Sequence, residues 1–168
     1  YLCRGGRTPE RSVVITFDDG YQSVFSHACP ILEKFGFTAS IFLVAGRMGG
    51  KSNWEGQDEA RAELLMSEEE ARDLARRGFT LGSHTFSHPR LTQLSDEAAF
   101  EEIMGSRLLL QDVLGQPVAF FSYPYSDVDA RLEGMVEKAG YTAACGGYYG
   151  PCSTFNLWRI PCLRDETA

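Results

Sequence analysis

Hydrophobic and polar positions alternate along this chain in two different periods, and the first period is that of strands. Six short runs are rich in β-branched or apolar residues, as buried strands are. Each is bounded by glycine, proline or polar residues. The runs lie at residues 13–17, 38–45, 79–82, 118–121, 141–145 and 158–162.

Between these runs, apolar residues recur every three to four positions, which is the spacing of a helix with one buried face. Helices are therefore expected at residues 21–35, 67–78, 95–114 and 130–138. Ser67 and Glu70 form an S-x-x-E capping box, which marks where the second of these helices begins.

Strands that alternate with helices predict a parallel sheet with crossover helices. The sheet is either an open doubly wound sheet or a closed β/α barrel, and periodicity does not choose between them. Residues 46–66 interrupt the alternation, with a short helical piece expected around 59–65 and an isolated Trp54. Such an excursion could reach over a site.

Composition and charge narrow the classes of partner. The 168 residues suit one compact core, and 16 basic against 23 acidic residues give a net charge of −7. This balance disfavours nucleic acid and anionic membranes. No apolar run approaches the roughly 20 residues that cross a bilayer. No signal peptide is visible, but the chain opens at Tyr1 instead of Met, so its absence says little about cellular location. Oligomeric state depends on loops whose shapes the sequence does not determine.

The five cysteines are odd in number and include no CxxC pair. This pattern indicates neither a disulfide framework nor a cysteine zinc site. Buried free thiols are expected, with one bridge among the last three as the alternative. The cysteines are Cys3, Cys29, Cys145, Cys152 and Cys162.

Three polar clusters directly follow expected strands, at residues 16–20, 83–89 and 122–125. In either architecture the carboxyl ends of the strands gather on one face, where catalytic groups collect. Asp18 and Asp19 are adjacent at a strand end, so their side chains point in different directions. One carboxylate can then bind a metal ion while the other reaches a water on that ion.

His84 and His88 are four residues apart and can converge on one ion. Two histidines and one carboxylate are a common catalytic zinc set, because they leave a coordination position for water or substrate. The alternatives are a simple Asp-Gly turn and a solvated pair of histidines. The metal site is favoured because the carboxylates and the histidines are expected on the same face. A structural zinc site would need further Cys or His ligands. His27, inside the first helix, is expected to be structural.

These motifs, T-F-D-D-G at 16–20, S-H-T-x-S-H-P at 83–89 and F-S-Y-P-Y at 121–125, resemble those of the NodB-type polysaccharide deacetylases, carbohydrate esterase family four. The resemblance covers residues 13–141. It implies a distorted, incomplete (β/α) barrel, with residues 1–168 as a single catalytic domain that is small or trimmed at both ends.

Carried over residue by residue, the resemblance implies a metal-dependent hydrolase that removes N-acetyl groups from N-acetylglucosamine-type units of a glycan. Asp18 would be the general base. Asp19, His84 and His88 would hold Zn²⁺, or Co²⁺ or Ni²⁺, which suit the same ligands. The backbone N–H of Tyr125 would help to bind the oxyanion.

The chain departs from the family pattern at two places. Many members carry an Arg, which steadies the catalytic Asp, where this chain has Ser122; Arg159 is a spatial substitute, unless it forms only a surface ion pair. The family's last motif brings a His as general acid, yet none follows His88. Either Asp18 returns its proton to the leaving amine, or that His lies beyond Ala168.

The Tyr-Pro-Tyr motif and the Gly-Gly-x-x-Asn-Trp loop at 49–54 resemble a subset of the family that accompanies surface-polysaccharide pathways. Aromatic faces suit the apolar faces of sugar rings, although core packing is the alternative for each ring. The residues expected to contact substrate are Trp54, Tyr123, Pro124 and Tyr125, with Tyr148 and Tyr149 as further stacking candidates.

Two other functions fit the same residues. One is removal of an O-acetyl or N-formyl group by the same site. The other is a carbohydrate-binding protein that kept the fold and lost turnover, which the absent C-terminal His favours and the intact Asp18 opposes.

Overall fold

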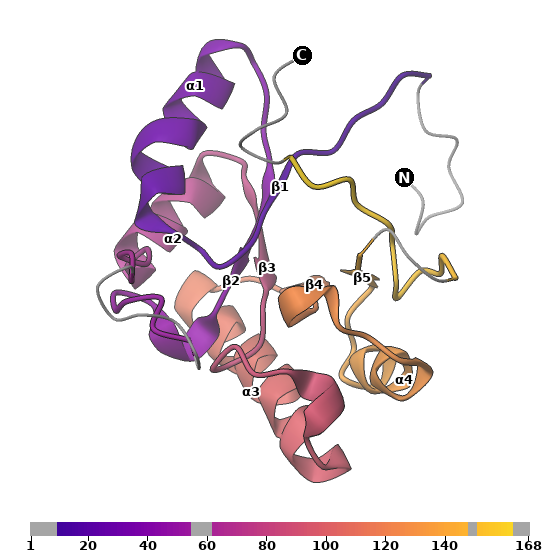
Figure 1. The fold of residues 1–168 in the computed structure, drawn as a ribbon. Helices are drawn as coiled ribbons and strands as arrows, with labels where there is room; N and C mark the ends of the chain where they lie inside the picture. The colour runs from indigo at the N-terminus through magenta and orange to yellow at the C-terminus, as the bar shows by residue number, and fades with distance from the viewer. Residues whose placement is uncertain (1–9, 55–61, 148–150, 163–168) are drawn as a thin grey trace.

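The computed structural model describes residues 10–54, 62–147 and 151–162. Its centre is a sheet in which every pair of neighbouring strands is parallel (Figure 1). The strands are β1 (Thr16–Phe17), β2 (Ser40–Leu43), β3 (Thr80–Ser83), β4 (Phe120–Ser122) and β5 (Ala143–Cys145).

The strand order is β1-β2-β3-β4-β5, the same as in the sequence. A doubly wound sheet reverses its order at a switch point, whereas here every crossover moves to the next position, as in a β/α barrel. The expected fold class is therefore confirmed, as a parallel half-barrel of five strands.

In the described residues, four α-helices connect and cover the strands (Figure 1). α3 (Asp96–Leu114) packs against β3, α2 and α4, and it is the longest helix in the described residues. The expected capping box is present at α2, where Ser67 Oγ accepts from the backbone N–H of Glu70 and the Glu70 carboxylate accepts from that of Ser67. The helices are α1 (Cys29–Lys34), which continues a π-helix at Val24–Ala28, α2 (Glu68–Arg76), α3, and α4 (Ala130–Lys138).

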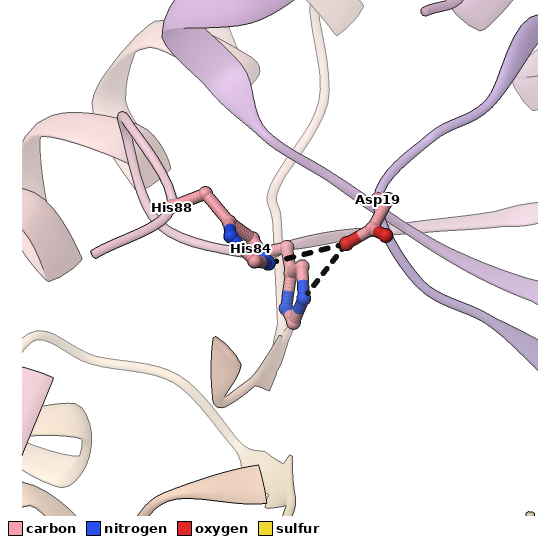
Figure 2. A group of neighbouring side chains, drawn as sticks. All are labelled: Asp19, His84 and His88. Atoms are coloured by element: carbon pink, nitrogen blue, oxygen red, sulfur yellow. Dashed lines mark ion pairs between the residues drawn. The ribbon is translucent and has the colours of Figure 1, made fainter. Parts of the chain in front are cut away.

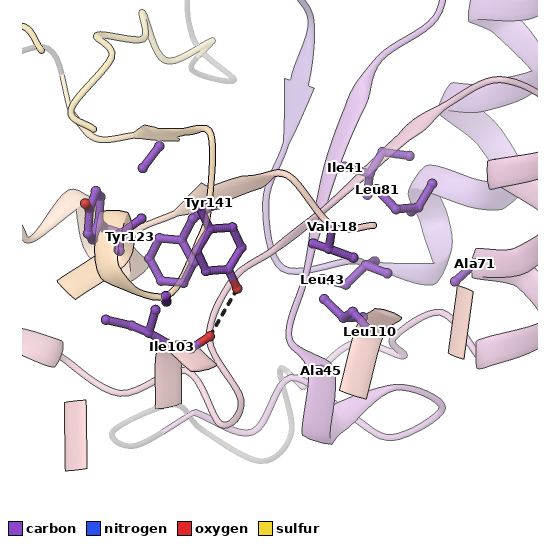
Figure 3. Packing of buried hydrophobic residues seen from close by; sticks show 14 of the residues in the cluster. Ile41, Leu43, Ala45, Ala71, Leu81, Ile103, Leu110, Val118, Tyr123 and Tyr141 are labelled. Carbon is purple, nitrogen blue, oxygen red and sulfur yellow. Dashed lines mark hydrogen bonds between the residues drawn. The ribbon is translucent and has the colours of Figure 1, made fainter. Parts of the chain in front are cut away.

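The core lies between the sheet and the helices that cover it. Figure 3 shows Leu43 of β2 packed near Leu110 and Val118, all of which are buried. Tyr141 donates its hydroxyl to the carbonyl oxygen of Ile103 at 3.1 Å, so its polar end is satisfied inside the core. Each fully buried aliphatic side chain contributes about 2 kcal/mol to folding.

Four expected strands are observed with bounds that differ by up to two residues at either end, whereas two differ more. Val13 and Val14 are 84% and 75% exposed, so the strand expected at 13–17 shortens to its last two residues, at the edge of the sheet. The strand expected at 158–162 is wrong, because only Leu157 pairs with Cys145 of β5. Pro161 has no N–H to donate, and Ile160 is 89% exposed.

The short helix expected around 59–65 is also wrong where it can be compared. Leu64 and Leu65 instead form isolated antiparallel bridges with Lys51 and Tyr21, so this excursion folds back along the start of the π-helix. Residues 59–61 lie outside the described residues.

The thiols are free, as expected, at the four described cysteines. Cys29 is buried and Cys145 is half-buried, but Cys152 and Cys162 are exposed, so the expectation of buried thiols is wrong for those two. Cys3 lies outside the described residues. In the same part of the chain, none of the helices is both long and apolar enough to span a membrane.

Candidate active site

The turn after β1 separates the two adjacent carboxylates. Asp19 and Gly20 both have left-handed backbone, with φ of 68° and 75°. A Cβ on residue 20 would approach Leu43 Cδ2 to 2.8 Å, so only glycine fits this close approach. The turn directs Asp18 and Asp19 to different partners.

Asp19 lies beside both expected histidines, as Figure 2 shows. Its Oδ1 is 3.3 Å from His84 Nε2 and 3.2 Å from His88 Nε2. Two atoms that bind one zinc ion at about 2.1 Å in a tetrahedral arrangement lie about 3.4 Å apart. The three residues therefore fit the ligand set of a metal ion, and they are a candidate metal site.

The two imidazoles are held differently. His84 Nδ1 lies 2.8 Å from the Ser122 carbonyl oxygen, which can only accept, so Nδ1 carries a proton and Nε2 is the nitrogen that faces the site. His88 Nδ1 is buried without a hydrogen-bond partner among the described residues. Its ring instead stacks on Trp54, with centroids 4.3 Å apart, and meets the edge of Tyr125 at 4.8 Å.

Electrostatics favour an ionised carboxylate at this position. Burial alone raises the pKa of Asp19, but hydrogen bonds with His84 and His88 lower that pKa far below its usual value. Burial lowers the pKa of His84, while its contact with Asp19 and the charge of Asp18 raise it above the ordinary value. The cluster thus attracts positive charge, which a divalent cation would supply in place of protons.

Asp18 binds Arg159 through both oxygens. Nη1 and Nη2 of Arg159 are each 2.7 Å from an Asp18 oxygen, which is the bidentate geometry of a strong Arg–carboxylate pair. Burial raises the pKa of Asp18, but the Arg159 hydrogen bonds, with the charges of His84 and Arg159, leave it below its usual value. Only 18% of the Arg159 side chain is exposed, so this pair is not a surface ion pair.

Ser122 joins the two halves of the site. Its hydroxyl accepts from Arg159 Nη2 at 3.0 Å, and its carbonyl oxygen accepts from His84 Nδ1. The position at which the family resemblance implied an Arg is thus a small residue that contacts an Arg from another segment. The space that Ser122 leaves is where the Arg159 guanidinium lies.

The two carboxylates and the two histidines open onto one pocket of about 270 Å³. A larger hollow of about 440 Å³ beside the start of α2 contains none of them. Tyr125 is at the pocket with φ of 60°, its side chain 43% exposed and its ring 4.0 Å from the Arg90 guanidinium carbon. The pocket is lined by Asp18, Asp19, Trp54, His84, His88, Tyr125 and Ser126.

Two of the residues expected to contact substrate lie elsewhere. Tyr123 is fully buried and donates its hydroxyl to the Phe155 carbonyl oxygen at 2.9 Å, so it has no exposed face for a sugar. Pro124 is buried as well. Both help to shape the turn that presents Tyr125. Tyr148 and Tyr149 lie outside the described residues.

Sequence reasoning missed Tyr21 and Ser126. The ring of Tyr21 lies near Asp19, and burial first, then the Asp19 charge, raises the pKa of Tyr21 to about 12. Its position directly after T-F-D-D-G was the available signal. Ser126, in contrast, had no signal beyond its closeness to the third motif.

The chain is a parallel half-barrel with a candidate metal centre at the carboxyl ends of its strands. This is the face at which β/α-barrel proteins have their active sites. The family model for polysaccharide deacetylases matches residues 5–144, so the chain belongs to the polysaccharide deacetylase family. The resemblance drawn from the motifs is confirmed at this level.

Individual relatives of the chain support the same family. The chain is 29% identical over 140 residues to YxkH of Bacillus subtilis, covering 83% of this chain and 46% of that protein. It is 24% identical over 149 residues to the poly-beta-1,6-N-acetyl-D-glucosamine N-deacetylase of Staphylococcus aureus (strain MSSA476), covering 83% and 49%. The chain thus spans about half the length of these curated relatives.

A solved structure supports the fold. The Streptococcus pyogenes deacetylase PplD, in complex with acetate, superposes with a TM-score of 0.82 at 22% identity. The match covers 98% of this chain and 70% of that chain. At this identity, the likeness concerns the fold.

Proposed function

We propose that residues 1–168 form one catalytic domain that removes N-acetyl groups from N-acetylglucosamine units of a polysaccharide. The observation that carries this proposal is the shared pocket, in which an Arg-held carboxylate lies beside an Asp-His-His set. Family membership supports hydrolysis, and the name of the S. aureus relative supports the N-acetyl sugar.

Asp19, His84 and His88 would hold Zn²⁺, with Co²⁺ or Ni²⁺ as alternatives for the same ligands. When bound, such an ion lowers the pKa of a coordinated water and polarises a substrate carbonyl. The buried Ser122 carbonyl keeps His84 in the tautomer that can coordinate.

Asp18 is the general base in this proposal. Arg159 keeps it ionised and fixes its orientation, while each oxygen retains a lone pair for a further hydrogen bond. Asp18 takes the proton of the attacking water and then returns it to the leaving amine, as microscopic reversibility permits. This cycle requires no histidine other than His84 and His88, and so no histidine that acts as a general acid.

The remaining pocket residues bind and orient the substrate. The backbone N–H of Tyr125 donates to the oxyanion, a contact typically worth about 3 kcal/mol in the transition state. Its exposed ring contacts a sugar face, whereas Trp54 forms the wall beside His88. The Tyr-Pro-Tyr motif that creates this arrangement supports membership of the corresponding subset of the family.

Acetate release tests this function. The purified protein, loaded with Zn²⁺, is given oligomers of N-acetylglucosamine, with O-acetylated and N-formylated sugars for comparison. Asp18→Asn is expected to lower the rate at least 100-fold, because it removes the base. Asp112→Asn, on the exposed side of α3, is the matched control.

Three outcomes are decisive. An active Asp18→Asn protein would contradict the assignment of the base. A preference for O-acetyl or N-formyl sugars would replace the proposed substrate. Binding of the oligomers without release of any acyl group would indicate a carbohydrate-binding protein.

A further inference from the structure

The loop that carries the two histidines has an unfavourable backbone. Thr85 and His88 both lie in the left-handed region, with φ of 69° and 71°, although neither is glycine. Such residues cost roughly 1–3 kcal/mol each and persist only where the surroundings hold them. What holds this loop therefore decides whether His84 and His88 meet.

Part of the support comes from the loop itself and from the short 3-10 helix (Ala45–Arg47) that follows β2. The backbone N–H groups of Ala45 and Gly46 donate to the carbonyl oxygens of Thr85 and Phe86, at 3.0 and 2.8 Å. The N–H of His88 donates to Thr85 Oγ1 at 2.9 Å. These bonds leave the N–H groups in the middle of the loop to find acceptors elsewhere.

A single carboxylate on α3 provides those acceptors. Glu102 Oε2 accepts from the backbone N–H of Phe86 at 2.9 Å and from that of Ser87 at 2.8 Å. Its Oε1 accepts from Ser87 Oγ at 2.6 Å. The next residue on the helix, Ile103, is completely buried in the core, so Glu102 projects from a fixed support.

We propose that Glu102 is a positioning residue for the metal ligands. Its three hydrogen bonds couple the loop to the helix that packs on β3, and so they hold His88 where its Nε2 meets Asp19. This inference rests on the proposed function, since it assumes that Asp19, His84 and His88 bind an ion. Glu102 touches neither the ion nor the substrate.

The test compares metal affinity in matched variants. Glu102→Ala removes both acceptor oxygens and so all three hydrogen bonds, and it is expected to weaken Zn²⁺ binding by roughly 10–100-fold. Glu102→Gln keeps an oxygen for both N–H groups and an amide for Ser87 Oγ, so its affinity should stay within a few-fold of wild type. Glu101→Ala, one residue away and exposed, should bind as wild type does. Competition with a chromophoric chelator measures all four proteins.

A readout of ligand geometry separates positioning from general stability. The visible absorption of the Co²⁺-loaded protein is sensitive to the coordination geometry, and Glu102→Ala should change the spectrum while Glu102→Gln should not. Ser87→Ala removes only the 2.6 Å contact, and it is expected to lower Zn²⁺ affinity less than Glu102→Ala does. This variant keeps the test decisive if Glu102→Ala does not fold.

The outcomes distinguish this inference from the proposed function. Failure of the wild type to bind Zn²⁺ or Co²⁺ would overturn both. Normal affinity and spectrum in both Glu102→Ala and Ser87→Ala would overturn only the role of Glu102. An equal loss of affinity in Glu102→Gln and Glu102→Ala would show that the charge matters and not the hydrogen bonds, which also contradicts positioning.

Discussion

At the scale of single residues, Arg159 forms an ion pair with Asp18, a residue 141 positions away in the sequence. Its guanidinium fills the space beside Ser122 and faces Asp18. Burial would raise the pKa of Asp18 if nothing opposed it, and the hydrogen bonds from Arg159 are the largest of the effects that lower it.

Replacement of Arg159 by Met should therefore raise the pKa of Asp18. Arg159 lowers this pKa in the wild type, so its loss leaves burial as the dominant effect and favours the protonated carboxyl. Deacetylation should slow because less of the base is ionised. Carbon-13 NMR of the labelled carboxyl in metal-free protein measures the shift.

Arg159→Lys is the matched control, since it keeps the charge and loses the bidentate geometry. Its effect on the pKa should be smaller than that of the Met variant. An unchanged carboxyl titration in Arg159→Met would contradict the proposed role.

The residues of the site were largely predictable, because three motifs directly follow strands and parallel strands end together. Asp18, Asp19, His84 and His88 lie around one pocket, as those motifs indicate. The burial of Tyr123 was not predictable, because the local sequence does not show which of the two tyrosines that flank Pro124 faces the core.

At the scale of elements, helices were easier to predict than strands. α2 and α3 begin at serine caps that the sequence displays, and these caps satisfy N–H groups locally. A strand forms its hydrogen bonds with neighbouring strands that are distant in the sequence, so local sequence does not reveal its partners. Residues 158–162 look like a strand, yet only Leu157 beside them pairs with β5.

The capping box of α2 should contribute measurably to stability. Ser67→Ala removes the acceptor for the Glu70 N–H, and it is expected to lower the free energy of unfolding by about 1 kcal/mol. Urea denaturation measures this loss, and deacetylation should not change.

Ser95→Ala at the start of α3 is a useful comparison. Ser95 accepts from the Ala98 N–H at 3.3 Å, without the reciprocal glutamate contact of a capping box. Ser95→Ala should therefore lower the free energy of unfolding less than Ser67→Ala does. A larger loss in Ser95→Ala would contradict this ranking of the two caps.

At the scale of the whole molecule, ion binding should stabilise the native fold. Asp19, His84 and His88 come from two segments that meet only when β1 and β3 are in place. An ion that binds only the folded chain at 1,000 times its Kd adds about 4 kcal/mol. For a chain of this size, chelation should then lower the Tm by on the order of 10 °C.

Scanning calorimetry with Zn²⁺ and with chelator measures the difference. Asp19→Ala lacks one ligand, so its Tm should be the same in both conditions. A Tm of the wild type that does not respond to chelation would contradict native-state binding.

The segment that contains Arg159 connects the two ends of the half-barrel. Leu157 pairs with Cys145 of β5, and two residues later Arg159 reaches Asp18 and Thr16 of β1. Where a complete barrel would continue its ladder, this molecule spans the opening with one bridge and one ion pair. The Asp18–Arg159 pair therefore depends on the distance between the two edge strands. Under the proposed function, a shift of β5 away from β1 would separate the base from the arginine that keeps it ionised.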